Sequence, residues 1–329
     1  VKLANGTALP AEMTVIAIGV TPNVALAREA GIEIGALGGI SVNEYMQTSD
    51  ADIYAAGDCI EVKQRLTGQS VLAPYGDLAN LEGRVAGENV ISGNVARFPG
   101  TVQTGICKVF EFTAGATGLS EDRAREAGFK PVSIVSAGPD KPGFMNGLGL
   151  ISYMVADADS GRLLGFQCVG PGDVSKQVAE AAAAIQGNLT IDDIVNFDLP
   201  YAPPFSLAID NFIGVSHALQ NKMKGLFVGL SAAVLFSRMN KGEELFIVDV
   251  RGADEYDQMR LGIGERLIPL GAMRGRLDEL PQDRAQEIIV YCKISLRGYE
   301  AARMLLGEGY TNVKVLEGGV LAWPYCREK

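Results

Sequence analysis

The sequence predicts an α/β protein with three successive domains, and three observations lead to this prediction. Residues 1–100 alternate short apolar runs with a helical pattern, which is typical of an α/β layer. Residues 101–225 place two neighbouring strand-like runs before an alanine-rich helix, as in an α+β unit. Residues 226–329 begin a fresh series of strand and helix patterns. The length of 329 residues agrees with more than one domain.

The first domain is predicted to contain two strands and a helix. Met13–Ile18 reads as a buried strand closed by Gly19, and Asp52–Ala56 reads as a second strand closed by Gly57. A helix is expected after the second strand, because apolar residues recur there at helical spacing. The residues with this spacing are Leu78, Leu81 and Val85.

The first residues of the chain read as the interior of a strand pair. Asn5-Gly6 lies between two short apolar segments, and this dipeptide is a hairpin signal. The chain also begins with Val1 instead of methionine. We therefore expect that the front of a larger protein precedes these residues.

The second domain contains recognisable helix starts and a hairpin. Ser120 is expected to cap a short helix that ends at Gly128. The apolar runs at 147–155 and 162–169 flank a turn cluster, DADSG, and predict a β-hairpin. Asp173 then begins an alanine-rich helix whose small residues can pack closely against another element or subunit.

The third domain has three strand candidates with helical patterns between them. These are Leu245–Val250, Glu287–Tyr291 and Val313–Leu316. The segment at 222–230 is the expected join between the second and third domains.

Composition and charge exclude several classes of function. A net charge of −10 disfavours nucleic acid as a partner, because a polyanion would be repelled. No apolar run is long enough to cross a bilayer, and no signal peptide is visible. The five cysteines are scattered and include no CxxC pair, which indicates no metal site and suits a reducing cytoplasm. The single histidine, His217, is read as structural or as a surface residue.

Cys292 is the candidate nucleophile of the third domain. It follows a predicted strand and precedes a predicted helix, so free backbone N–H groups gather near its thiol. A thiolate in such a place has a lowered pKa, and Arg297 adds a cation five residues later. Taken alone, Cys292 is better read as a cysteine buried at a strand end. The spacing of the cysteine, the arginine and the helix together favours a functional role.

The stretches FIVDVRGADEY, YCKISLRGYEAARMLLGEGY and VKVLEGGVLAW, in this order, resemble the rhodanese-like sulfurtransferase domain over residues 226–329. The resemblance implies that Cys292 carries a persulfide and that the next five residues cradle it. These are Lys293, Ile294, Ser295, Leu296 and Arg297. Asp249 and Arg251 match a family element that is expected to form a structural network. A related cysteine phosphatase needs five residues between cysteine and arginine, whereas four stand here, so sulfur transfer is preferred to phosphoryl transfer.

Three stretches of the first domain resemble the pyridine nucleotide–disulfide oxidoreductases. They are VIAIGVTPN (15–23), TSDADIYAAGDC (48–59) and LAPYGDLANLEGRVAGENVISG (72–93). The resemblance implies that Asp58 hydrogen-bonds the ribityl chain of FAD and that a helix N-terminus faces the flavin. The expected cofactor-binding residues are Gly57, Asp58, Ala73, Pro74 and Leu78. Cys59 is read as structural.

Residues 101–225 resemble the dimerisation domain of the same flavoproteins, which implies a homodimer. GRLLGFQCVG and YAPPFS (201–206) resemble the branch that reduces coenzyme A disulfide and persulfides. Tyr201 is thereby a candidate proton donor or substrate-positioning group. Its alternative is a packing tyrosine fixed by Pro203-Pro204.

These resemblances imply a parent protein that uses FAD and NAD(P)H, with coenzyme A as a possible further ligand, to reduce a small sulfur compound. The chain has no strand–GxGxxG–helix motif, so this chain alone is expected to hold FAD weakly and to lack reductase activity. Three alternatives remain open. They are a stand-alone thiosulfate or persulfide sulfurtransferase, a docking module in place of an active rhodanese-like domain, and an NADH peroxidase or oxidase of the same family.

Overall fold

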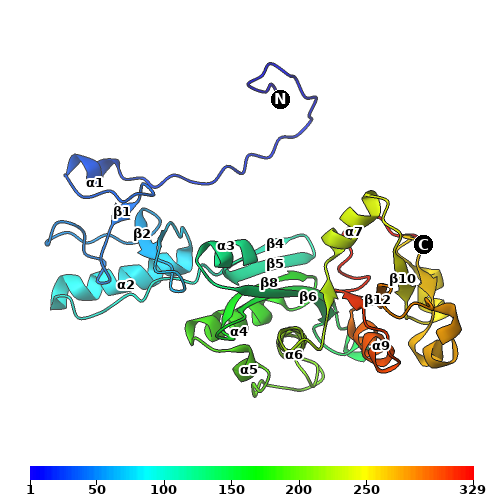
Figure 1. The fold of residues 1–329 in the computed structure, drawn as a ribbon. Helices are drawn as coiled ribbons and strands as arrows, with labels where there is room; N and C mark the ends of the chain where they lie inside the picture. The colour runs from blue at the N-terminus through cyan, green and yellow to red at the C-terminus, as the bar shows by residue number, and fades with distance from the viewer. The chain divides into compact units, whose positions relative to one another are not determined.

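The computed structural model describes residues 1–329 and divides them into two compact units, Val1–Thr101 and Val102–Lys329 (Figure 1). The first unit contains a small sheet of three strands in the order β1-β2-β3. Strands β1 and β2 are parallel, and β2 and β3 are antiparallel. The elements of this unit are α1 (Ala25–Glu29), β1 (Ile40–Ser41), β2 (Ile60–Lys63), β3 (Ser70–Val71) and α2 (Gly76–Ser92).

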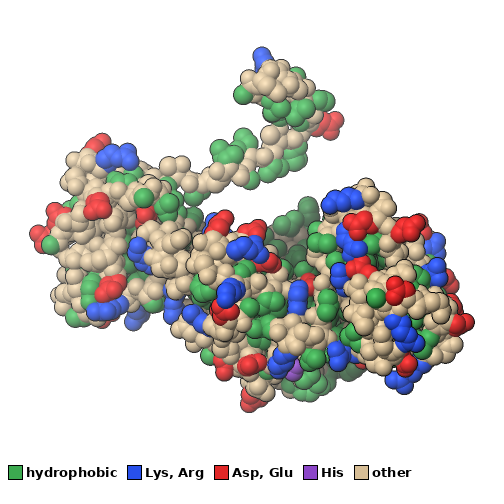
Figure 2. All heavy atoms as spheres, viewed as in Figure 1, with side chains coloured by type: hydrophobic (Ala, Val, Ile, Leu, Met, Phe, Trp, Pro, Cys, Tyr) green, Lys and Arg blue, Asp and Glu red, His purple; other side chains and the backbone are tan.

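The predicted strand at Met13–Ile18 is wrong. These residues are extended but pair with no other strand, and Ile18 is 92% exposed. Figure 2 shows apolar side chains along this segment, with no layer of residues covering them. An apolar run becomes a buried strand only when neighbouring strands take up its backbone N–H and C=O groups.

The predicted strand at Asp52–Ala56 is reduced to a single bridge between Tyr54 and Gln47. Hydrogen bonds between nearby side chains and this backbone stabilise turns instead of a strand. The backbone N–H of Asp52 donates to Asp50 Oδ1 at 2.9 Å, and the Thr48 hydroxyl donates to the carbonyl of Ile53 at 2.9 Å. Such side-chain bonds compete with strand pairing.

The predicted helix after this segment is confirmed as α2. Leu78 and Val85 pack against the core of the first unit, whereas Leu81 is exposed. The fully buried residues of the helix are polar, Glu82 and Asn89. The apolar spacing thus locates the helix but only partly identifies its buried face.

The second unit begins with a five-stranded antiparallel sheet in the order β4-β5-β8-β7-β6. Helices α4 and α6 pack against this sheet (Figure 1). Its strands are β4 (Gly105–Val109), β5 (Phe112–Gly118), β6 (Pro131–Pro139), β7 (Gly149–Asp157) and β8 (Leu163–Gly170). Its helices are α3 (Glu121–Glu126), η1 (Gly143–Met145), α4 (Val174–Gln186), α5 (Ile191–Ile194) and α6 (Asn211–Met223).

The local signals in this part of the sequence are confirmed. The side chain of Ser120 accepts a hydrogen bond from the backbone N–H of Arg123, and that of Asp173 accepts from Lys176. The predicted hairpin is formed by β7 and β8. Alanines of α4, including Ala181 and Ala184, are buried.

The same unit continues into a parallel five-stranded sheet in the order β11-β10-β12-β13-β9. Its strands are β9 (Gly229–Leu230), β10 (Phe246–Asp249), β11 (Arg266–Leu267), β12 (Ile288–Tyr291) and β13 (Val313–Leu316). Its helices are α7 (Ala232–Asn240), α8 (Ala253–Gln258), η2 (Leu270–Gly275), η3 (Leu277–Glu279) and α9 (Leu296–Gly307). The three strands predicted from the sequence correspond to β10, β12 and β13.

A compact core holds this parallel sheet. Tyr291, Leu316 and Trp323 are buried together, and Phe236 stacks on Tyr325 beside them. Burial on both faces explains why its strands read as near-continuous apolar runs in the sequence. None of the helices in the chain has the length and apolar character needed to cross a bilayer.

Candidate functional site

Cys292 lies where β12 ends, in a short loop before α9. Its side chain is fully buried. The loop turns sharply at Ser295, whose φ of 87° is left-handed. Helix α9 then begins at Leu296 without a side-chain cap, so the N–H groups of its first turn have no capping partner. This arrangement provides donors for an anion at the loop.

The backbone of the loop is held by the segment that follows β13. The carbonyl of Cys292 accepts a hydrogen bond from the N–H of Val320 at 3.0 Å, and the carbonyl of Lys293 accepts from Leu321 at 3.1 Å. The hydroxyl of Ser295 donates to the carbonyl of Leu316 at 3.1 Å. These bonds fix the carbonyls of Cys292 and Lys293 and the side chain of Ser295, and so hold the backbone of the loop in place.

Gly319 makes this close packing possible. Its φ is 56°, and a Cβ at this position would lie 2.2 Å from the carbonyl oxygen of Cys292. Any other residue would therefore push against the loop backbone and adopt an unfavourable conformation.

Arg297 is paired with Glu255 of α8 instead of being a free cation. Its two terminal nitrogens donate to the two oxygens of Glu255 at 2.7 and 2.8 Å, as a bidentate pair. The guanidinium of Arg297 lowers the pKa of the Glu255 carboxyl to about 2. The pKa of Arg297 is raised, chiefly by its hydrogen bonds to Glu255 and to a smaller degree by Cys292.

Glu255 is a site residue that the sequence argument did not single out. It also accepts a hydrogen bond from the N–H of Gly252 at 3.3 Å, which anchors the start of α8. Spacing alone gives one clue, because Glu255 stands three residues after the N-cap Gly252, as in a capping box. Its bond to Arg297, 42 positions later, depends on the tertiary fold.

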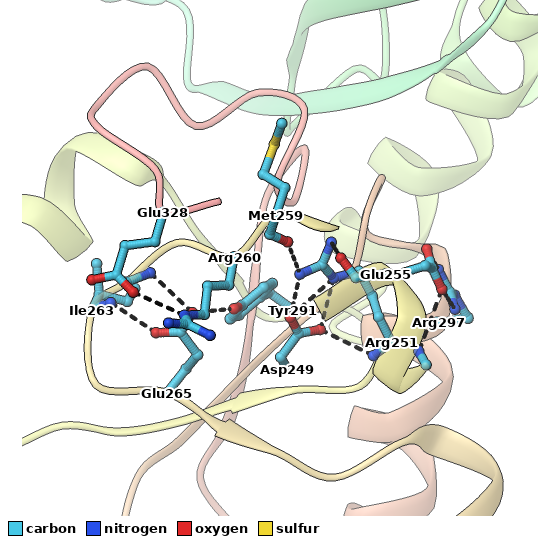
Figure 3. A network of polar contacts seen from close by, with 12 residues as sticks. Asp249, Arg251, Glu255, Met259, Arg260, Ile263, Glu265, Tyr291, Arg297 and Glu328 are labelled. Atoms are coloured by element: carbon cyan, nitrogen blue, oxygen red, sulfur yellow. Dashed lines mark hydrogen bonds and ion pairs between the residues drawn. The ribbon is translucent and has the colours of Figure 1, made fainter. Parts of the chain in front are cut away.

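Asp249 and Arg251 form a buried network at the end of β10 (Figure 3). Arg251 donates three side-chain hydrogen bonds to the Asp249 carboxylate, at 2.6 to 3.0 Å. It also donates to the carbonyl of Glu255 at 3.3 Å and to that of Met259 at 2.7 Å. Arg251 therefore ties the end of β10 to α8, which carries the partner of Arg297.

Tyr291, which directly precedes Cys292, is anchored by a hydrogen bond to Glu265. Its hydroxyl donates to Glu265 Oε1 at 2.9 Å (Figure 3). Glu265 also accepts from the N–H groups of Gly262 and Ile263. Burial and the neighbouring carboxylates raise the pKa of Tyr291, so this phenol stays protonated and serves as a donor.

None of the five cysteines forms a disulfide. Burial raises the pKa of Cys168 to about 11, which makes it a poor nucleophile. Burial also raises the pKa of Cys59, whose thiol lies 3.7 Å from the carbonyl of Ala56. Cys292 is distinguished from both by its position before a helix and beside Arg297.

Tyr201 lies in the segment between α5 and α6, and 54% of its surface is exposed. No hydrogen bond joins it to the Cys292 loop. The structure therefore leaves Tyr201 available at the surface and outside the group of residues around Cys292.

The turn at Gly57-Asp58 lies beside helix α2 in the first unit. Gly57 has φ 89°, and its N–H donates to the buried carboxylate of Glu82 at 2.9 Å. Burial raises the pKa of Glu82, and Asp58 adds a smaller contribution. A Cβ at Gly57 would lie 3.6 Å from the side chain of Ala79. Glu82 was not anticipated from the sequence.

The turn at Gly57-Asp58 leaves polar groups without protein partners. The carboxylate of Asp58 is exposed, and no protein group bonds to it. Helix α2 starts after Tyr75 without a side-chain cap, so its first N–H groups are free. Ala73 and Leu78 pack on the core and fix the start of the helix, while Pro74 is exposed. A carboxylate acceptor beside free helix donors suits a ligand that has both hydroxyl groups and an electron-rich ring edge.

Family models match most of the chain. Residues 1–74 match the pyridine nucleotide-disulphide oxidoreductase model, residues 104–212 match the dimerisation domain of that family, and residues 231–325 match the rhodanese-like domain. The chain therefore combines parts of a pyridine nucleotide-disulphide oxidoreductase with a rhodanese-like domain.

Individual proteins are similar over long stretches. The CoA-dependent NAD(P)H sulfur oxidoreductase of Pyrococcus furiosus is 37% identical, over 66% of this chain and 49% of its own length. The NAD-dependent persulfide reductase of A. fulgidus is 41% identical with a TM-score of 0.88, over 98% of this chain and 57% of its own. The reduced CoADR-RHD of Bacillus anthracis is 34% identical with a TM-score of 0.86, over the same shares of the two chains. This chain spans about half the length of the curated relatives it matches.

Proposed function

We propose that this chain is part of an FAD-dependent oxidoreductase that uses NAD(P)H to reduce a persulfide, a polysulfide or coenzyme A disulfide. The observation that supports this most strongly is the union, in one chain, of a flavoprotein turn and a cysteine loop that can carry sulfur. The relatives named for sulfur and persulfide reduction support the same reading, and two of the solved structures match 98% of the chain. For a persulfide, the balanced reaction takes RSSH, NAD(P)H and a proton to RSH, H₂S and NAD(P)⁺.

Cys292 is proposed to carry sulfane sulfur. Its thiolate attacks the outer sulfur of a persulfide, an S–S bond forms at Cys292, and the original S–S bond breaks to release the donor thiolate. The free N–H groups at the start of α9 stabilise the anionic persulfide. The proposed cradle consists of Lys293, Ile294, Ser295, Leu296 and Arg297. Arg297 is oriented by Glu255 and acts mainly as a fixed donor, because the pair is close to neutral.

FAD, when bound, would supply two-electron transfer between the nicotinamide and the sulfur chemistry. The residues proposed to hold it in this chain are Gly57, Asp58, Ala73, Pro74 and Leu78. In this proposal, the Asp58 carboxylate accepts hydrogen bonds from hydroxyl groups of FAD, and the N-terminus of α2 stabilises negative charge on the flavin. Apolar residues at 13–20 are exposed in this chain. Additional residues of complete nucleotide-binding domains would cover them, and retention of FAD by residues 1–329 alone is therefore expected to be weak.

The protein is proposed to act as a homodimer in the cytoplasm. Apolar side chains gather at the exposed β4–β5 hairpin, where Phe110 is 89% exposed. The exposed apolar residues of the hairpin are Ile106, Val109, Phe110 and Phe112. A second copy of the chain would cover them, in keeping with the match to a dimerisation domain.

The exposed Tyr201 is then proposed to serve the active site of the partner copy. The scattered free thiols agree with a reducing compartment.

The alternatives differ in measurable ways. A stand-alone sulfurtransferase would transfer sulfur without NAD(P)H, a docking module would take up no sulfur at Cys292, and an oxidase or peroxidase would consume oxygen or peroxide. The test uses this chain joined to complete nucleotide-binding domains. NAD(P)H oxidation that depends on an added persulfide supports the proposal. No oxidation with any persulfide, polysulfide or disulfide would overturn it.

A further inference from the structure

Glu317, directly after β13, extends its carboxylate from the rhodanese-like domain to the antiparallel sheet. Its Oε1 lies 2.6 Å from the Lys222 ammonium at the end of α6, and its Oε2 accepts the N–H of Val135 in β6 at 3.0 Å. Lys222 also donates to the carbonyl of Ser133 at 2.7 Å. Glu317 is only 5% exposed. One carboxylate thus joins two elements of the neighbouring domain.

The chain leaves room for this carboxylate and keeps it close. A Cβ at Gly229, the first residue of β9, would lie 1.9 Å from Glu317 Oε1. A Cβ at Gly318 would lie 3.1 Å from Val135. Leu321 lines a cavity together with Leu150 of the antiparallel sheet. The segment 317–321 therefore approaches the dimerisation domain at Glu317, Gly318 and Leu321.

The last three residues of segment 317–321 also hold the loop of Cys292. Val320 and Leu321 donate their N–H groups to the carbonyls of Cys292 and Lys293. Gly319 packs against the Cys292 carbonyl with no space for a side chain. Only Gly318 separates Glu317, a member of the interdomain ion pair, from the residues that contact the loop.

We propose that Glu317 is a positioning residue for sulfur transfer. Through segment 317–321, Glu317 couples the Cys292 loop to the dimerisation domain. This inference rests on the proposed role of Cys292 as a sulfur carrier. The Lys222–Glu317 pair fixes the segment, and the segment fixes the carbonyls of the loop. The loop N–H groups consequently keep the orientation that an anionic persulfide requires.

Loss of the pair has a defined consequence. Glu317→Gln leaves the Lys222 ammonium partly buried without a counter-charge, and this penalty favours a shift of segment 317–321. Because Cys292 is fully buried, its reaction with an alkylating reagent requires movement of the loop. A looser segment therefore exposes the thiol more often while it positions a persulfide less well.

The test measures two rates on the full chain at a temperature well below unfolding. One is the alkylation of Cys292 by iodoacetamide, and the other is sulfur uptake from a persulfide donor, read by intact mass. For Glu317→Gln and for Lys222→Gln we expect alkylation to rise and uptake to fall, each by roughly tenfold. Lys222→Arg, which keeps the charge, should restore both rates to near the wild-type values.

Glu287→Gln is the matched control. Glu287 also belongs to a partly buried ion-pair group, with Arg238 and Lys314, but it lies at the far end of β12 from Cys292. The variant Glu287→Gln should lower stability and leave the rates of alkylation and sulfur uptake unchanged. Equal rates in the wild type and in Lys222→Gln, whose position lies outside the rhodanese-like domain, would overturn the positioning role even if Glu317→Gln fails to fold. If the wild type itself takes up no sulfur, the role of Cys292 fails instead, and the alkylation rates still test the coupling.

Discussion

Arg297 and Glu255 form a bidentate ion pair, with N–O distances of 2.7 and 2.8 Å. Arg297 lies in the first turn of α9, directly after the Cys292 loop. The pair turns the arginine from a free cation into a donor of fixed orientation. It also joins α8 to the start of α9, and Arg251 fixes α8 from behind. The loop is thus held by ionic contacts on one side and by segment 317–321 on the other.

The pKa of Glu255 predicts how stability depends on acid. The folded pKa is about 2, below the ordinary value of 4.5, so this carboxylate contributes stability above about pH 4.5 and loses it as the pH falls towards 2. Glu255→Gln should therefore lower stability at pH 6 and flatten its decline between pH 4.5 and 3. Urea unfolding at several pH values measures this. An unchanged decline in the variant would contradict the assignment.

The buried pair Asp249–Arg251 should matter far more to stability than an exposed pair. Arg251→Met leaves the Asp249 carboxylate buried and unpaired, and this should cost about 3–5 kcal/mol. Arg276→Met breaks the exposed pair with Glu279 and should change stability very little, because solvent screens the pair. Chemical denaturation of the two variants provides the comparison. Equal losses would show that the Asp249–Arg251 network is not a structural centre.

Gly319→Ala should disturb the loop without touching any ionisable group. The added methyl group would lie 2.2 Å from the carbonyl oxygen of Cys292, at a left-handed φ of 56°. We expect about 1–3 kcal/mol of destabilisation and a slower uptake of sulfur. Gly307→Ala, at the end of α9 with open space around it, is the control and should be neutral or slightly stabilising. Normal uptake in Gly319→Ala would refute the packing argument.

The β4–β5 hairpin should control assembly. Light scattering should give a mass of twice one chain for the wild type, and one chain for Phe110→Asp, because a charge is introduced at a proposed apolar contact. Leu26 is 80% exposed but lies in α1, and Leu26→Asp should leave the dimer intact. A wild-type mass of one chain at micromolar concentration would disprove the homodimer, and a dimeric Phe110→Asp would move the contact elsewhere.

Local signals in the sequence identified the parts of the fold that local physics determines. Ser120 and Asp173 cap helices as expected, and the turn cluster before Arg162 forms the β7–β8 hairpin. Cys292 was located at a strand end before a helix for the same reason. The apolar run at 13–18 misled the prediction because burial depends on partner strands, which no local pattern reveals.

The partners of the site residues could not be predicted. Glu255 reaches Arg297 across 42 positions, and Lys222 reaches Glu317 across 95. Such contacts follow from the packing of distant elements, while sequence spacing reports only neighbours on one helix or strand. The sequence therefore indicated the candidate nucleophile and its loop, whereas the residues around them could be identified only from the structure.

Intact mass after incubation with a persulfide donor tests the central claim most directly, with Cys292→Ser measured beside the wild type. A gain of one sulfur atom in the wild type and none in the variant is the predicted result. No gain in the wild type, with its Cys292 shown to be reduced and open to alkylation, would contradict the claim that Cys292 carries sulfur.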